Sequence, residues 1–114
     1  MALKSVSGVT LYVYDVAKSA DFYESLGFLR RAREDRYASV RMNWYWIDLV
    51  EAAEAAASAG GVVINIAVDD VDKQHAEFTK RGLKPEPVED LPNGNRQFEL
   101  ADLDGYRLGF FTKK

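Results

Sequence analysis

The stretch that decides the fold is YVYDVAKSADFYESLGF, Tyr12–Phe28, because it returns in outline later in the chain. The second copy is AVDDVDKQHAEFTKRGL, Ala67–Leu83, which starts 67 − 12 = 55 positions later. At this offset Asp15 aligns with Asp70, and both copies end in a glycine followed by an apolar residue. An internal repeat identifies the structural unit of a fold, so we expect one unit used twice.

Each copy carries the signals of a strand followed by a capped helix. Just before the first aspartate, Val9, Leu11 and Val13 alternate with less apolar residues, which predicts a half-buried strand. The Asp15 carboxylate can accept the first free backbone N–H groups of a helix, where the positive end of the helix dipole also favours it. Gly27 can adopt the left-handed conformation that ends a helix.

Further short strands complete each half of the chain. The first half is predicted to contain strands over residues 28–34, 36–43 and 44–50. The second half is predicted to contain a strand over 62–68, a helix over 70–81 ended by Gly82, and strands over 84–89, 96–100 and 106–112. The predicted fold class is therefore α+β.

Two βαβββ modules, over residues 1–50 and 62–114, together make one domain in this prediction. An Ala- and Gly-rich link over 51–61 joins them. A four-stranded sheet covered by one helix leaves its other face open, so two modules are expected to meet. The link leaves open whether they meet within one chain or between two.

Composition narrows the functional classes. The chain has 18 acidic and 15 basic side chains and a net charge of −3, which argues against nucleic acid or an anionic membrane as partner. It has no cysteine, which excludes disulfides and thiolate metal sites. No apolar run is long enough for a signal peptide or a membrane span, so a cytoplasmic protein is expected.

Three motifs together resemble one protein family. They are VTLYVYDVAKSADFYESLGF at residues 9–28, VDDVD at 68–72 and ELADLDGYRLGFF at 99–111. The combination resembles the vicinal oxygen chelate superfamily, the group of glyoxalases, bleomycin resistance proteins and extradiol dioxygenases. The resemblance implies two βαβββ modules around a concave sheet. It does not imply one chemistry, because one scaffold can host unrelated functions.

The resemblance also implies where a metal would be held. Metal-dependent members carry His or Gln on the first strand of each module and Glu on the last strand. Here those positions fall on Gly8, Val63 and Gly109, which offer no side-chain ligand atom, and on Asp48. Catalytic metal sites usually have three protein ligands, so a site without a protein-held metal, and without any cofactor, is expected.

Side-chain alternation predicts the remaining members of the concave face. Gly8 and Gly109 are expected to leave room there, and aromatic rings with isolated polar groups suit a flat, partly apolar ligand. The candidate ligand-binding residues are Tyr12, Trp44, Trp46, Asp48, Asn65, Arg107 and Phe111.

The functional prediction is a metal-independent binder of antibiotic-like or aromatic small molecules, closest in character to the bleomycin-resistance branch and homodimeric. The enzyme alternative is a lyase or dioxygenase whose divalent metal is held by ligands such as Asp48 and Glu99. A third alternative is an interaction module whose cleft is filled by side chains. His75 is expected to pack between helix and sheet, and Arg41 and Arg107 are expected in surface ion pairs.

Overall fold

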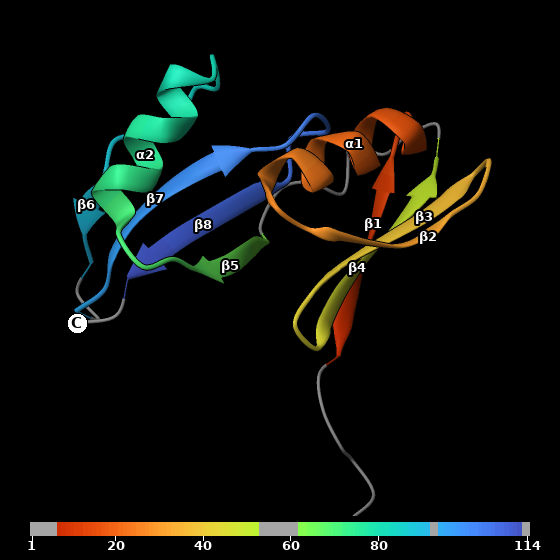
Figure 1. Ribbon diagram of the computed structural model, residues 1–114, viewed down its shortest axis with the longest axis horizontal. Coiled ribbons are helices and arrows are strands. Elements are labelled where there is room, and N and C mark those ends of the chain that lie inside the picture. The colour runs from red at the N-terminus through yellow and green to blue at the C-terminus, as the bar shows by residue number, and fades with distance from the viewer. Residues whose placement is uncertain (1–6, 53–61, 92–93, 113–114) are drawn as a thin grey trace, which may run out of the picture. The chain divides into compact units, whose positions relative to one another are not determined.

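The computed structural model describes residues 7–52, 62–91 and 94–112. The chain divides into two compact units, Met1–Ser58 (unit 1) and Ala59–Lys114 (unit 2), shown in Figure 1. The predicted link at 51–61 falls almost entirely outside the described residues, and Glu51 still belongs to a strand.

Unit 1 is one βαβββ module. Its elements are β1 (Gly8–Val13), α1 (Val16–Leu26), β2 (Leu29–Arg33), β3 (Tyr37–Met42) and β4 (Tyr45–Glu51). The strands lie in the order β1-β4-β3-β2, with β1 parallel to β4 and the other neighbours antiparallel. Helix α1 packs on β3 and β4, on one side of the sheet.

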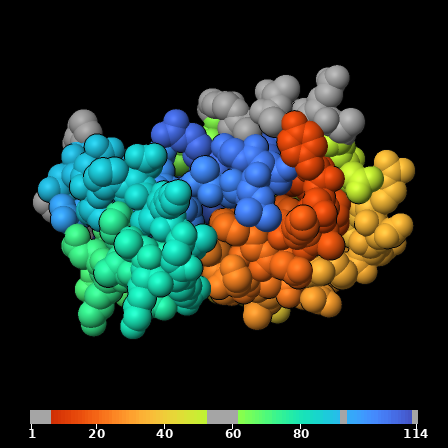
Figure 2. Space-filling model, turned by 90° about the horizontal axis from the view of Figure 1, so that it is seen from above, coloured from red at the N-terminus to blue at the C-terminus, as the bar shows by residue number. Residues whose placement is uncertain are grey.

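Unit 2 repeats this arrangement. Its elements are β5 (Val63–Ala67), α2 (Val71–Lys80), β6 (Glu89–Asp90), β7 (Arg96–Ala101) and β8 (Arg107–Thr112). The strand order is β5-β8-β7-β6, again with one parallel and two antiparallel neighbours. Side chains of α1 (orange) and α2 (green to cyan) reach the surface of their units in Figure 2. The α+β prediction with two βαβββ modules is confirmed.

The helix boundaries follow from the predicted caps. Asp15 accepts a hydrogen bond from the Lys18 N–H at 3.0 Å, and Asp70 accepts one from the Lys73 N–H at 3.0 Å. Gly27 ends α1 with a φ of 118°, in the left-handed region where glycine has no Cβ to clash. The repeated Asp-to-Gly spacing therefore encodes two helices of nearly equal length.

The core of each unit lies between its helix and its sheet. In unit 1 the core-facing β-strand residues include Leu11, Ile47 and Leu49, all at most 2% exposed. In unit 2 the rings of Phe98 and Phe110 stack with centroids 5.2 Å apart. Leu11, Ile47, Leu49 and Phe110 alternate along their strands with the residues predicted for the concave face, so they face the helix.

His75 lies between helix α2 and the sheet of unit 2, as predicted. Its ring meets Phe98 edge to face at 5.1 Å, and its Nε2 lies 3.0 Å from the Glu86 carbonyl oxygen. The side chain is half-buried and serves packing between the helix, the sheet and the segment before β6.

Two strand predictions are wrong in detail. The strand expected over 84–89 is reduced to Glu89–Asp90, because Pro85 and Pro87 have no N–H to donate to a neighbouring strand. The turn between β3 and β4 contains Asn43, with a φ of 55°, and Trp44, which was expected to begin a strand. Asparagine tolerates this left-handed conformation better than most residues.

Candidate functional site

Each sheet has an open face, opposite the face that its helix covers. The unit 1 open face is defined by the strand residues that alternate with the core positions: Gly8, Thr10, Tyr12, Leu29, Arg31, Tyr37, Ser39, Arg41, Trp46, Asp48 and Val50. The unit 2 open face is defined in the same way: Val63, Asn65, Ala67, Glu89, Gln97, Glu99, Ala101, Arg107, Gly109 and Phe111.

Trp46 fills the space beside Gly8 on the unit 1 open face. The two residues are direct partners in the β1–β4 register. A Cβ atom added to Gly8 would lie 2.6 Å from Cδ1 and 2.7 Å from Nε1 of the indole, and 2.5 Å from the Trp46 carbonyl oxygen. The expectation that Gly8 leaves room is therefore wrong, because the indole occupies that room.

Arg31 lies over the indole of Trp46. The centre of its guanidinium is 4.4 Å from the ring centroid, which is cation–π geometry. The same group donates to the buried Ser39 hydroxyl at 3.1 Å and, at the limit of a hydrogen bond, to Asp48 Oδ1 at 3.5 Å. An aromatic ring, a cation and a carboxylate thus lie together on an open sheet face.

A bulge in β2 places Arg31 on this face. The register with β3 shifts between Arg30 and Ala32. Arg30 and Arg33 are three residues apart and would face opposite sides of a regular strand. Both instead reach Glu24 of α1 on the helix side, at 3.3 Å and 2.5 Å, and Arg31 between them points to the open face.

Asp48 is held by two donors. The Tyr37 hydroxyl donates to its Oδ1 at 3.2 Å, and Arg31 reaches the same oxygen. The carboxylate side chain is 23% exposed. Asp48 is therefore an oriented acceptor within a network that also includes Ser39, and one cation already lies beside it.

The unit 2 open face has different chemistry. The Arg107 Nε donates to Glu99 Oε1 at 2.7 Å, which confirms the ion pair expected for Arg107. A Cβ atom added to Gly109 would lie 2.9 Å from Asn65 Oδ1 and 3.1 Å from Gln97 Nε2. Side-chain amides thus cover Gly109, and the expected room there is filled as well.

The structure places six of the seven predicted site residues on the two open faces. Tyr12, Trp46 and Asp48 belong to unit 1, and Asn65, Arg107 and Phe111 belong to unit 2. Trp44 is instead in the β3–β4 turn and is 92% exposed.

The sequence reasoning missed several side chains of these faces, among them Arg31, Tyr37, Ser39 and Gln97. The alternation of β3 and β7 contains the signal for Tyr37, Ser39 and Gln97. No comparable signal marks Arg31, since the bulge that directs it is a tertiary feature.

The residues present do not fit the metal site of the metal-dependent relatives. Gly8, Val63 and Gly109 have no donor atom in their side chains, and Asp48 already accepts from a phenol and lies beside a guanidinium. Within the part of the chain that the structure describes, no three His, Cys, Asp or Glu side chains are grouped so that they could hold a metal ion.

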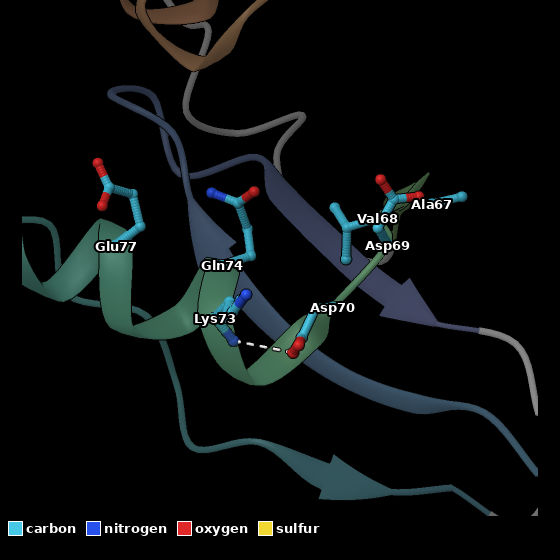
Figure 3. A pocket seen from close by; sticks show the side chains of 7 residues that line it. All are labelled: Ala67, Val68, Asp69, Asp70, Lys73, Gln74 and Glu77. Carbon is cyan, nitrogen blue, oxygen red and sulfur yellow. Dashed lines mark hydrogen bonds between the residues drawn. The ribbon is translucent and has the colours of Figure 1, made fainter.

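A separate hollow lies beside the N-terminal end of α2 (Figure 3). Its lining residues are Ala67, Val68, Asp69, Asp70, Lys73, Gln74 and Glu77. One of its carboxylates, Asp70, is occupied by capping the helix, as the dashed line in Figure 3 shows. The hollow contains no aromatic side chain, so it lacks the chemistry of the unit 1 open face.

The fold and the open faces define a class of α+β protein built from two βαβββ modules. A family model described as the Glyoxalase/Bleomycin resistance protein/Dioxygenase superfamily matches residues 5–110. The chain belongs to this superfamily.

Solved structures agree with this assignment. A putative glyoxalase family protein from Bacillus anthracis matches with a TM-score of 0.83 at 16% identity, over 100% of this chain and 98% of that one. A lactoylglutathione lyase from Agrobacterium tumefaciens matches with a TM-score of 0.79 at 17% identity, over 98% and 96%. A bleomycin resistance determinant encoded on the transposon Tn5 matches with a TM-score of 0.79 at 17% identity, over 97% and 99%.

At these identities the similarity shows the fold alone. No curated protein sequence matches the chain. The described part of the chain contains no helix with the length and apolar character needed to cross a membrane.

Proposed function

We propose that this protein binds a planar aromatic small molecule on the unit 1 open face and needs no protein-held metal to do so. The observation that carries the proposal is the cluster of Arg31, Trp46 and Asp48. A ring can stack on the indole or on the guanidinium plane, and the polar groups beside them can fix its orientation. Tyr12 lies on β1, on the same face, and is 47% exposed.

The donor set supports a binder over a metalloenzyme. Divalent metals prefer several carboxylate or imidazole ligands, and three of the four family positions hold Gly or Val. The polar groups of the unit 1 open face are a guanidinium, a phenol and one carboxylate, which together suit hydrogen bonding to an organic ligand. The Tn5 bleomycin resistance determinant has the same fold, which is compatible with an antibiotic-like ligand.

The wider proposal is a cytoplasmic homodimer. A sheet with one open face per unit favours pairing of modules within or between chains. Asn65, Arg107 and Phe111 are proposed as ligand contacts of the unit 2 open face, whereas Trp44, 92% exposed in the β3–β4 turn, lies outside the proposed site.

The test is isothermal titration calorimetry with three naphthalene probes that differ in one substituent: 2-naphthoate, 2-naphthylmethanol and 2-naphthylmethylammonium, all in the presence of EDTA. We expect saturable binding of at least one probe. Trp46→Leu should weaken it by about tenfold, since stacking on a large ring contributes on the order of 1 kcal/mol or more.

Trp44→Leu is the matched control, because Trp44 is a tryptophan outside the open face. It should change the affinity by less than about threefold. Absence of binding by all three probes in EDTA would overturn the proposal. Binding that is then restored by Zn²⁺ or Mn²⁺ would favour the metal-dependent lyase or dioxygenase alternative.

A further inference from the structure

A second arginine, Arg41, lies beside Trp46 on the unit 1 open face. It is the direct cross-strand partner of Trp46 in the β3–β4 register, so the two side chains project on the same side of the sheet. Arg41 is exposed and forms no ion pair with any acidic residue that the structure describes. The expectation that Arg41 belongs to a surface ion pair is therefore wrong for this part of the chain.

The charge of this face has the opposite sign to that of the whole chain. The strand side chains of the unit 1 open face include two cations, Arg31 and Arg41, and one anion, Asp48, so their sum is +1. The chain as a whole has a net charge of −3. Arg31 lies over the Trp46 indole and Arg41 is the cross-strand partner of Trp46, while Arg31 meets Asp48 only at 3.5 Å.

The corresponding positions of unit 2 do not share this excess. The register aligns Arg41 with Ala101, since Arg41 opposes Trp46 and Ala101 opposes Arg107. Arg107 itself is paired with Glu99. The unsatisfied guanidinium is thus a property of unit 1 alone among the described residues.

We infer that the unit 1 open face selects planar aromatic anions, with Arg41 binding the carboxylate or sulfonate group and Trp46 and Arg31 contacting the ring. This inference rests on the proposed function and names its ligand class. A guanidinium matches the planar, two-oxygen geometry of a carboxylate and forms charge-assisted hydrogen bonds with it. A cationic ligand would instead meet two like charges beside the indole and only one carboxylate.

The experiment compares the three naphthalene probes at low ionic strength, in EDTA, by calorimetry. We expect 2-naphthoate to bind at least about tenfold more tightly than 2-naphthylmethanol or 2-naphthylmethylammonium. Arg41→Gln should lower the affinity for 2-naphthoate by about tenfold and leave that for 2-naphthylmethanol within about twofold. Added salt should weaken the binding of 2-naphthoate and leave that of the neutral 2-naphthylmethanol unchanged.

Arg36→Gln is the matched control, because Arg36 pairs with Glu51 at the strand end and its side chain is 76% exposed. It should leave all three affinities unchanged. Equal binding of the three probes, or stronger binding of the cation, would overturn the inference while the proposed function stands. Binding of none of them in EDTA would overturn both. An Arg41→Gln variant that binds 2-naphthoate as tightly as the parent would show that Arg41 does not bind the carboxylate, and would overturn the inference.

Discussion

The two units share one hydrogen-bonded frame and differ in the chemistry of their open faces. The 55-position offset aligns β1 with β5, and the strand register then aligns Trp46 with Arg107 and Asp48 with Gly109. Unit 1 therefore has a ring and a carboxylate where unit 2 has an ion-paired guanidinium and a glycine covered by amides. Helix caps and core residues thus maintain the same βαβββ structure in both units, while the residues of the open face differ between them.

The cores of the two units also differ at aligned positions. Tyr23 of α1 corresponds to Phe78 of α2, and the register aligns Ala38 with Phe98. Phe78, Phe98 and Phe110 form a ring cluster in unit 2, with centroid separations of 5.1 to 6.0 Å. In unit 1 the position of Phe98 is occupied by Ala38, so unit 1 lacks this ring of the cluster.

The largest expected effect is the loss of a ring from the unit 2 core. Phe98→Ala should lower the free energy of unfolding by about 3–5 kcal/mol, because it creates a cavity and removes the contacts with Phe110 and His75. Urea unfolding followed by circular dichroism measures it. Leu103→Ala, at a 59% exposed position, is the control and should cost less than about 0.5 kcal/mol. Equal costs would contradict the assigned core.

The next largest effect is a difference in stability between alanine variants of the two open-face glycines, Gly8 and Gly109. Gly8→Ala should cost about 1–3 kcal/mol, since its new methyl group would meet the Trp46 carbonyl oxygen at 2.5 Å and backbone atoms must move. Gly109→Ala should cost less than Gly8→Ala, about 1 kcal/mol, because its nearest contacts are side-chain atoms of Asn65, Gln97 and Val63 at 2.9 to 3.1 Å and none is a backbone atom.

Thermal unfolding of these two variants under one condition tests the order. A greater loss for Gly109→Ala than for Gly8→Ala would contradict the account of what fills each position. A Gly8→Ala variant as stable as the parent would show that the Trp46 indole and its backbone do not occupy the space beside β1.

The smallest effect concerns the helix side of unit 1. Hydrogen bonds from Arg30 and then Arg33 lower the pKa of the Glu24 carboxyl from its ordinary value of 4.5. Because the folded pKa is depressed, the stabilisation is fully present above pH 4.5 and is lost as the pH falls through the lower, folded value.

Glu24→Gln should therefore cost less than about 1 kcal/mol at pH 7, and this difference from the parent should shrink as the pH falls below 4.5. Urea unfolding at several pH values measures the difference. Glu34→Gln, an exposed carboxylate in no ion pair with a described residue, should show no such trend. A Glu24→Gln difference that grows in acid would contradict the assigned pairing.

The repeat made most of the fold predictable from the sequence. Asp15, Asp70 and Gly27 act locally through caps and a left-handed turn, so their roles follow from neighbouring residues. The strand expected over 84–89 is shorter in the structure because Pro85 and Pro87 cannot donate to a neighbouring strand, a loss that alternation of apolar residues does not register. Alternation likewise assigned the faces of β1, β4, β5 and β8 correctly.

The details of the site were less predictable. Whether a glycine leaves room depends on a neighbouring strand, and Trp46 fills the space at Gly8 through a contact 46 − 8 = 38 residues away in the chain. Arg31 reaches the open face only because β2 has a bulge. That Arg41 has no acidic partner among the described residues depends on which side chains the sheet brings near it, and no local pattern contains that information.

In the proposed function an aromatic ligand lies against Trp46 without a metal ion. The chain has two tryptophans, so a Trp44→Phe variant leaves Trp46 as the source of the one indole N–H signal in a nitrogen-15 correlation spectrum. Titration with 2-naphthoate in EDTA should shift that signal progressively to saturation. A signal that stays unmoved in EDTA and shifts only after Zn²⁺ is supplied in excess of the chelator would contradict the claim.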